Sequence, residues 1–364
     1  MQLLFRSIPS RCWIGLILLS GWSASAQQAQ LQPADPIHLP ALSDSNSPSQ
    51  WLNEQFMIYQ SYALPLVATG SSQADFLRVR PVLLNSFRNY PLWIEATWVD
   101  DDGTVYAWYH HESWVCPPLA VPSIGALVSH DGGFSFQDQG IILESGYAND
   151  CNSKSQAFAG GHGDFTVLLD PARQYFYFYF TNYSGPLSSQ GIAAARMAFR
   201  DRAKPAGRVW KFYQNSWSEP GRHGRVSALL PAAVSWSRAD TDSFWGPSLH
   251  WNNYLNEYVM LLNHSCCSPG WHQEGIYISF NPDLSNPHGW TSPQKILDGD
   301  QARWYPQVIG LEPGSTDKIA DKEARFFMGA DSEWVIDFSL PGEDAPMDDS
   351  QSGGAPPVDD SQQN

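Results

Sequence analysis

Three acidic residues fall at the ends of strand-like runs, where carboxyl groups are well placed for acid–base chemistry. Glu95 and Asp164 lie near the starts of two such runs, and Glu274 precedes a third. A protonated carboxyl next to an ionised one can donate and accept protons in one reaction. We predict Asp164 as the base, because Gly161 and Gly163 leave room for a ligand, and Glu274 or Glu95 as the acid. The alternative is structural: Asp164 would be a buried carboxylate that accepts backbone hydrogen bonds, and Glu95 would touch no ligand.

Polar and aromatic residues fall at the same strand ends as these acids. In an antiparallel sheet, the start of one strand, the end of the next and the start of the third lie at the same end of the sheet. We therefore predict a substrate-binding mouth made of His110, Glu112, His162, Asn182, Trp245, His250, Asn263, Trp304 and Tyr305. Alternatives stay open: the His110 and Glu112 pair could bind a metal or make loop hydrogen bonds. His162 and His250 could face a central cation or water, or lie satisfied in the core.

A strand–turn–strand pattern occurs four times and predicts a series of small antiparallel sheets. The paired runs span residues 93–98 and 105–109, 163–169 and 175–180, 246–251 and 258–262, and 305–310 and 324–328. Turn-forming residues separate the two runs of each pair, as Asp170 and Pro171 do in the second. Further strands follow most of these hairpins. Four antiparallel strands make one blade of a β-propeller, whose blades converge on a central pocket.

The expected fold is all-β, a five-bladed β-propeller with four-stranded antiparallel blades. Residues from about 60 to 92 supply the fifth, less regular blade. The last unit lacks its outermost strand, and the N-terminal run 56–59 is expected to supply it and so close the ring. We expect a signal peptide at 1–26, an N-terminal extension at 27–54, the propeller at 55–340 and a disordered acidic tail at 341–364.

The two ends of the chain differ in composition from its body. Residues 1–26 combine Arg6 and Arg11, a short apolar run and a small-residue cleavage site, which is typical of a secretory signal; a retained anchor is the alternative. Residues 341–364 contain no Lys or Arg and too few apolar groups to offset chain entropy. The net charge of −16 opposes binding to nucleic acid or anionic lipid. We expect a secreted or periplasmic monomer that does not bind membranes after cleavage.

Four cysteines follow the predicted cleavage site, and an oxidising compartment favours their pairing. Cys116 and Cys151 flank one sheet segment and could close a loop. Cys266 and Cys267 form either a vicinal disulfide or two separate bonds. The spacing of Cys and His is not that of a zinc site. We predict no metal ligand set and no cofactor, while a central structural cation is compatible with the fold.

One segment supports the propeller independently of the repeats. Residues 129–136 match the Asp-box pattern Ser-x-Asp-x-Gly-x-Thr-Trp, with Ser and Phe in the last two places. The Asp and Gly of that pattern stabilise a tight turn. Together with residues 163–165, 245–248 and 273–284, this segment resembles the five-bladed propeller glycosidases, which include arabinanases, β-xylosidases and fructan hydrolases. The resemblance covers most of residues 55–340 and implies three acidic residues at the inner ends of separate blades.

The resemblance implies a carbohydrate-active protein, most directly a glycoside hydrolase that uses paired carboxylates on an oligo- or polysaccharide. Two departures from the family pattern leave other functions open. The first blade offers only Asp75 as an early acid, and Trp245-Gly246-Pro247 stands where the family has Glu-Gly-Pro. One alternative is therefore a non-catalytic glycan-binding propeller with an aromatic mouth. Another is an interaction scaffold at the cell surface.

Overall fold

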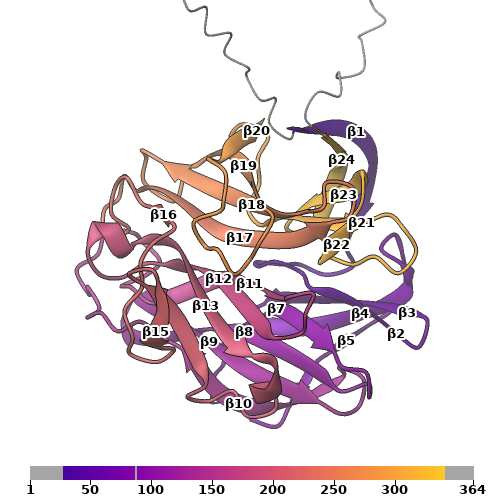
Figure 1. The fold of residues 1–364 in the computed structure, drawn as a ribbon, viewed down its shortest axis with the longest axis horizontal. Coiled ribbons are helices and arrows are strands. Elements are labelled where there is room, and N and C mark those ends of the chain that lie inside the picture. Colours follow the sequence, from indigo (N-terminus) through magenta and orange to yellow (C-terminus); the bar gives the residue numbers. More distant parts are fainter. Residues whose placement is uncertain (1–27, 87, 341–364) are drawn as a thin grey trace, which may run out of the picture. The chain divides into compact units, whose positions relative to one another are not determined.

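The computed structural model describes residues 28–86 and 88–340, which consist almost entirely of β-strands and turns. These residues belong to one compact unit. Five small sheets are arranged as the blades of a propeller (Figure 1). The predicted five-bladed all-β fold is therefore confirmed. The expected signal peptide and acidic tail lie outside the described residues.

Apart from β1, β6, β16 and β22, the blades follow one another along the chain, and the strands of each blade run in sequence order from the innermost strand outward. The first comprises β2 (Ser49–Leu52), β3 (Gln55–Tyr62), β4 (Leu64–Ser72) and β5 (Asp75–Pro81). The second comprises β7 (Leu92–Val99), β8 (Val105–Cys116), β9 (Leu119–Ser129) and β10 (Ser135–Leu143), with β6 (Leu83–Leu84) beside β10. The third comprises β11 (His162–Leu169), β12 (Tyr175–Asn182), β13 (Gly191–Ala198), β14 (Val209–Tyr213) and β15 (Ser216–Pro220), with β16 (Leu230–Pro231) beside β13.

The last two blades complete the ring. The fourth comprises β17 (Asp242–Asn252), β18 (Glu257–Cys266), β19 (Gln273–Asn281) and β20 (Gln294–Asp298), with β22 (Ile319–Ala320) parallel to β17. The fifth comprises β21 (Pro306–Gly310), β23 (Glu323–Met328), β24 (Asp331–Ser339) and β1 (Gln28–His38). Two short 3-10 helices, η1 (Leu187–Ser189) and η2 (Phe199–Asp201), lie in the third blade. All four predicted hairpins are present, as β7/β8, β11/β12, β17/β18 and β21/β23.

Strand β12 shows why the sequence forms blades. Its alternating Tyr and Phe residues point to opposite faces of the sheet, because side chains on a strand alternate. Phe176 and Phe178 pack with Trp108 of the second blade, while Tyr177 and Tyr179 join a cluster with the fourth blade. Both faces of the strand are therefore buried, which is the condition for a blade between two neighbours.

The strand that closes the ring differs from the prediction. β1 pairs with β24 as the outermost strand of the fifth blade, whereas the run 56–59 lies in β3 of the first blade. Phe56 and Ile58 pack toward the fifth blade and Met57 and Tyr59 toward the second, so this run needs neighbours on both faces. An apolar run of this kind fits an interior position better than an edge. The propeller strands consequently begin at residue 28, ahead of the expected start at residue 55.

The turn between β9 and β10 is closed by one carboxylate. Asp131 accepts hydrogen bonds from Ser129 Oγ at 2.7 Å and from the backbone N–H groups of Phe134 and Ser135. Although its partial burial opposes this, the hydrogen bonds from Ser135 and Ser129 lower the pKa of Asp131. The segment 129–136 thus acts as a turn element and does not reach the pocket described below.

Two disulfides join the four cysteines that were expected to pair. Cys116–Cys151 links the end of β8 to the loop before β11, and Cys266–Cys267 is vicinal, at the end of β18. Among the described residues, no helix has the length and apolar character needed to cross a membrane.

Candidate active site

Three β-bulges aim side chains at one end of the propeller. The strand register skips Glu95 between Ile94 and Ala96, skips Asp164 between Gly163 and Phe165, and shifts again after Trp245. A bulged residue leaves the hydrogen-bonded ladder and its side chain turns away from the regular alternation. Asp164 also has a φ of 42°, a strained value for a residue with a side chain, and such strain gathers at functional sites.

His110 on β8 lies at the centre of the buried acids. Its Nδ1 accepts the backbone N–H of Asp164 at 3.2 Å and lies 3.3 Å from Glu95 Oε1. Glu95 Oε2 accepts the backbone N–H of Phe165 at 2.7 Å. Burial raises the pKa of Glu95 to about 8, so this carboxyl carries a proton at neutral pH. The proton of His110 then resides on Nε2, which lies 3.7 Å from Glu112 Oε1.

Asp164 is held by two tyrosines. The hydroxyl of Tyr183 donates a short hydrogen bond to Oδ2, and that of Tyr305 lies 3.5 Å from Oδ1. Burial raises the pKa of Asp164 to about 6, while the neighbouring His110 acts in the opposite direction. The carboxyl is therefore mostly ionised at neutral pH and close to its titration range, as a proton acceptor in catalysis requires.

A pocket of about 280 Å³ opens in front of Asp164. Three carboxyl groups and several aromatic rings line it together with small loop residues: Asp44, Glu112, Trp114, Pro118, Ala120, Gln156, Ala157, Phe158, Asp164, Trp245, Trp271, Trp304 and Tyr305. Burial raises the pKa of both Asp44 and Glu112. Trp114 and Trp304 are 55% and 39% exposed, so their faces are open to a ligand. The pocket thus combines acids of raised pKa with exposed aromatic rings.

Most residues predicted from the sequence lie at this pocket. Glu112, Trp245, Trp304 and Tyr305 line it with Asp164, and Glu95 and His110 lie directly behind Asp164. Asn263 supports the wall, since its Oδ1 accepts the backbone N–H of Tyr305 at 3.2 Å.

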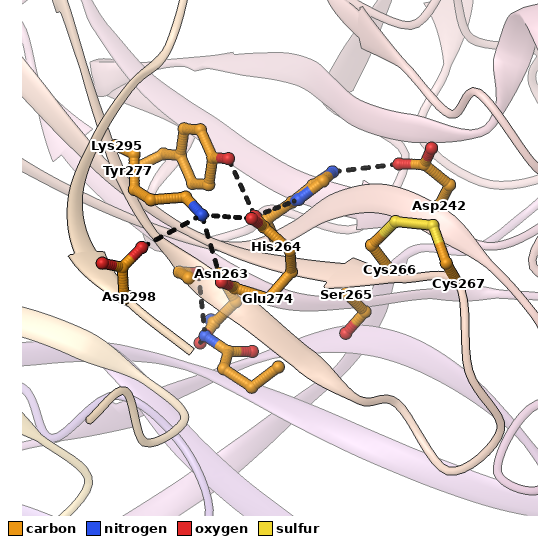
Figure 2. A network of polar contacts seen from close by, with 12 residues as sticks. Asp242, Asn263, His264, Ser265, Cys266, Cys267, Glu274, Tyr277, Lys295 and Asp298 are labelled. Carbon is orange, nitrogen blue, oxygen red and sulfur yellow. Dashed lines mark hydrogen bonds and ion pairs between the residues drawn. A yellow bond between two sulfur atoms is a disulfide. The ribbon is translucent and has the colours of Figure 1, made fainter. Parts of the chain in front are cut away.

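Glu274 belongs to a different polar network (Figure 2). His264 Nδ1 lies 2.9 Å from its Oε2, the Tyr277 hydroxyl donates to the same oxygen, and Lys295 pairs with Oε1. Although partial burial opposes the change, hydrogen bonds from Lys295, His264 and Tyr277 lower the pKa of Glu274 to about 2. A carboxylate that is ionised and already partnered is a poor proton donor. Glu274 also does not line the pocket, so the structure does not support its predicted role as the acid.

Three other predicted residues lie in the interior and do not line the pocket. His162 Nε2 accepts a hydrogen bond from Lys211 at 2.9 Å, and its Nδ1 donates to Gly161 O. Asn182 donates to two backbone carbonyls of its own loop. His250 packs beside Phe338, and burial lowers its pKa to about 3. These residues are satisfied or neutral core residues.

Sequence reasoning missed pocket residues that come from segments outside the hairpin repeats. Asp44 lies between β1 and β2, and its backbone N–H is bonded to Ser61 O at 2.8 Å. Asp75, the early acid considered from the sequence, is exposed on β5 and bonded to Ser71 Oγ instead. Trp114, Phe158 and Trp271 lie in irregular or bulged segments. Their aromatic side chains were the only signal in the sequence for a role in the pocket, because no strand pattern predicted where these residues would lie.

Two clusters of described residues bring together groups that could bind a metal ion: Glu95 with His110 and Asp164, and Asp242 with Cys266 and Cys267. In the first, the Nδ1 lone pair of His110 and one oxygen of Glu95 already accept backbone hydrogen bonds. In the second, both sulfurs are in the disulfide. The first cluster is therefore better described as a hydrogen-bonded network. His162 and His250, which were considered for a central cation, belong to neither cluster.

The vicinal disulfide holds the loop that brings Trp271 to the pocket. Cys266 N–H donates to His272 O, and Ser265 Oγ to Trp271 O, so the loop closes at its base. Trp271 packs 5.2 Å from Trp245 and donates its Nε1–H to Ser155 O. The disulfide removes backbone freedom next to this closure.

We expect replacement of both Cys266 and Cys267 by Ser to loosen Trp271. The apparent affinity for a pocket ligand should fall by about two- to tenfold, because the ring must then be ordered on binding. For a catalysed reaction the effect should appear in KM and not in kcat. The measurement is steady-state kinetics together with tryptophan emission, which should shift to longer wavelength. Unchanged KM and emission would show that the disulfide does not position this ring.

The sequence matches no protein-family model and none of the curated proteins with which it was compared. The fold matches solved structures. A candidate exo-β-1,3-galactanase from Bifidobacterium bifidum aligns with a TM-score of 0.51 and 12% identity, over 84% of this chain and 92% of that one. An endo-arabinase from Bacteroides thetaiotaomicron aligns with a TM-score of 0.50 and 10% identity, over 85% and 98%. At these identities the likeness shows a shared five-bladed propeller fold, as the sequence resemblance implied.

Proposed function

We propose that the protein is an exported glycoside hydrolase that cleaves a neutral oligo- or polysaccharide in the pocket at Asp164. The observation that carries this proposal is the meeting of Asp44, Glu112 and Asp164, all with raised pKa values, in one aromatic-lined pocket. Carboxyl pairs with separated protonation states are the usual machinery for cleaving glycosidic bonds.

Asp164 and Glu112 have the geometry of a working pair. The ring of His110 lies between them, with Nδ1 3.8 Å from Asp164 Oδ1 and Nε2 3.7 Å from Glu112 Oε1. The two carboxyl groups are therefore within about 10 Å of each other, an upper limit that allows the spacing of about 6.5–9.5 Å found in inverting glycosidases. His110 keeps them apart and leaves the space in front of both open to the pocket.

The surroundings assign different roles to the two groups. Tyr183 and Tyr305 direct hydroxyl groups at Asp164 and favour its ionised form, so Asp164 acts as the base. Burial raises the pKa of Glu112, and the nearby Asp164 and Asp44 act in the same direction, while His110 opposes them. Glu112 is therefore the proton donor for the leaving group. It takes the role that the sequence assigned to Glu274 or Glu95, and Glu95 acts behind the pocket by orienting His110.

The aromatic residues suit a sugar ligand. Trp304 and Trp114 are exposed at the mouth, and Trp245 lies 5.5 Å from Trp304 in an edge-to-face contact that fixes its orientation. The apolar face of a sugar ring packs on such rings, while its hydroxyls reach the carboxylates around them.

Export is part of the proposal. The sequence of residues 1–26 has the composition of a secretory signal, and two disulfides are compatible with an oxidising compartment. Fractionation of cells that express the full chain tests it, since the protein should appear outside the cytoplasm without its first residues.

The hydrolase proposal is tested by incubating the purified protein with a panel of arabinans, galactans, xylans and fructans and detecting released sugars. Release that depends on Asp164 supports it. Retention of a glycan without any product would instead indicate a non-catalytic glycan-binding protein, the function favoured if the acid has been lost. Absence of both release and retention across the panel would refute a carbohydrate function.

We expect Glu112→Gln to lower turnover of natural glycans by about 10²–10⁴-fold, because the leaving group then lacks its proton donor. A substrate with an activated aryl leaving group needs little protonation and should lose much less. The measurement is kcat for the two substrate types, with exposed Glu323→Gln as a matched control. An equal loss on both substrates would mean that Glu112 has another role.

A further inference from the structure

A second cavity lies at the opposite end of the blades. It has a volume of about 430 Å³, larger than the 280 Å³ pocket at Asp164. Its walls come from the turn after β11, the end of β17 and the segment after β19. These strands begin at the Asp164 end of the propeller and finish here, between the third and fourth blades. We call this space the rim cavity.

Aromatic residues form much of the rim cavity. Tyr175, Tyr177, Trp251 and Tyr258 line it, and Trp251 meets Tyr258 edge-to-face at 4.8 Å. Tyr177 and Tyr258 are buried as walls, whereas Tyr175 and Trp251 are partly exposed. Tyr175 and Trp251 pack against the buried cluster that contains Tyr177 and Tyr258, and each leaves part of its ring accessible to a ligand.

The charged groups among these rings have hydrogen-bond donors and acceptors that can still bind a ligand. Arg196 stacks on Tyr175 at 4.3 Å and on Trp217 at 5.0 Å. Within residues 28–86 and 88–340, it forms no ion pair with a carboxylate. Asp170 caps its own turn by accepting the backbone N–H groups of Gln174 and Tyr175, and each oxygen keeps a further lone pair. Among the described residues, Asp283 likewise accepts hydrogen bonds only from Ser285.

The combination discriminates between ligand classes. Two carboxylates against one guanidinium, on a protein of net charge −16, disfavour an anion. The remaining lone pairs of Asp170 and Asp283 and the Arg196 guanidinium would lose their contact with water beneath an apolar ligand, which disfavours such a ligand. A neutral sugar ring avoids both problems. Its apolar face packs on aromatic rings, while its adjacent hydroxyls form hydrogen bonds with the charged groups.

We propose that the rim cavity binds a neutral oligosaccharide segment, as a carbohydrate site separate from the pocket at Asp164. The choice of carbohydrate rests partly on the proposed function; the cavity and its free polar groups do not. A site at the far end of the blades cannot hold the residues being cleaved. It holds another part of a long glycan, or a neighbouring chain, and so raises the local concentration of polymer at the protein.

The experiment measures glycan binding without turnover, by depletion of soluble polysaccharide in the Asp164→Asn background. Ala172→Trp, at the exposed turn of the rim cavity, should fill it. The double variant Tyr258→Phe/Asp283→Asn should remove the Tyr258 hydroxyl and the charge of Asp283 while keeping the rings. We expect either change to weaken polysaccharide binding by about three- to tenfold or more. In the otherwise wild-type protein, the same changes should leave hydrolysis of a short oligosaccharide unchanged.

Glu312→Trp, at an exposed turn of the fifth blade, is the matched control for the added tryptophan and should bind polysaccharide normally. Trp304→Ala separates the two sites, because it affects the pocket and leaves the rim cavity intact. The proposal is overturned if both rim-cavity variants bind polysaccharide as the parent does, or if Trp304→Ala alone abolishes all binding. The proposal survives if the wild-type protein shows no hydrolysis but binding still depends on the rim cavity, so its failure and that of the hydrolase proposal are distinct.

Discussion

Replacing Asp164 by Asn should reduce glycan hydrolysis by about 10²–10⁴-fold while leaving the fold intact. The amide cannot accept the proton or carry the negative charge that the base requires. Asn tolerates the positive φ of 42° at this position better than most residues, and its amide oxygen can still accept the hydrogen bond from Tyr183 while its amide nitrogen faces the Tyr305 hydroxyl. Steady-state kinetics on the best substrate of the panel, with a thermal unfolding curve beside it, make the measurement.

Asp298→Asn is the matched control for that change, since Asp298 is 77% exposed and does not line the pocket. In the wild type, activity should rise with pH through about 6, because Asp164 must be ionised and its raised pKa delays ionisation. It should fall again at higher pH as Glu112 loses its proton. Wild-type turnover by Asp164→Asn, or an activity that shows no rise near pH 6, would remove Asp164 from the mechanism.

Replacing Lys211 by Met should destabilise the fold by several kcal/mol, because each buried acceptor left without a donor costs about 1–3 kcal/mol. The ammonium of Lys211 is fully buried and donates to Glu144 O, Gly224 O and His162 Nε2 at 2.6–2.9 Å. Three donors meet three acceptors, so Met leaves all three acceptors unpaired in the interior. Urea denaturation of the two proteins measures the difference, and exposed Lys204→Met should change stability by less than about 0.5 kcal/mol.

The same residue predicts a pH dependence of stability. Burial lowers the pKa of Lys211 to about 7, below its value of about 10.5 in the unfolded chain. Between these values the unfolded state binds more protons, so the contribution of Lys211 to the free energy of unfolding rises with pH. The difference between the wild type and Lys211→Met should therefore be larger at pH 9 than at pH 6. A constant difference would show that the buried amine keeps the same charge over this range.

Much of the fold follows from local patterns. The alternating Tyr and Phe of residues 175–180 and the turn at Asp170 and Pro171 place a hairpin without reference to the rest of the chain, because strand and turn preferences act over a few residues. The ring closure does not follow in this way. β1 is a largely polar, exposed edge strand, so its sequence carries little strand signal, and its pairing with β24 joins the two ends of the unit.

The sequence likewise predicted part of the candidate site, and the tertiary structure decided the rest. Strand ends were sufficient to bring Asp164, Glu95, Glu112, Trp304 and Tyr305 to one mouth, since antiparallel order determines which ends meet. The sequence could not show that bulges turn Glu95 and Asp164 onto His110, or that Lys295 and His264 occupy Glu274. It also could not place Asp44, whose position depends on contacts across blades. The position and the alternating pattern of a strand are local properties of the chain. The orientation, burial and protonation of an acid depend instead on neighbours that are distant in sequence, and only the packed propeller brings those neighbours together.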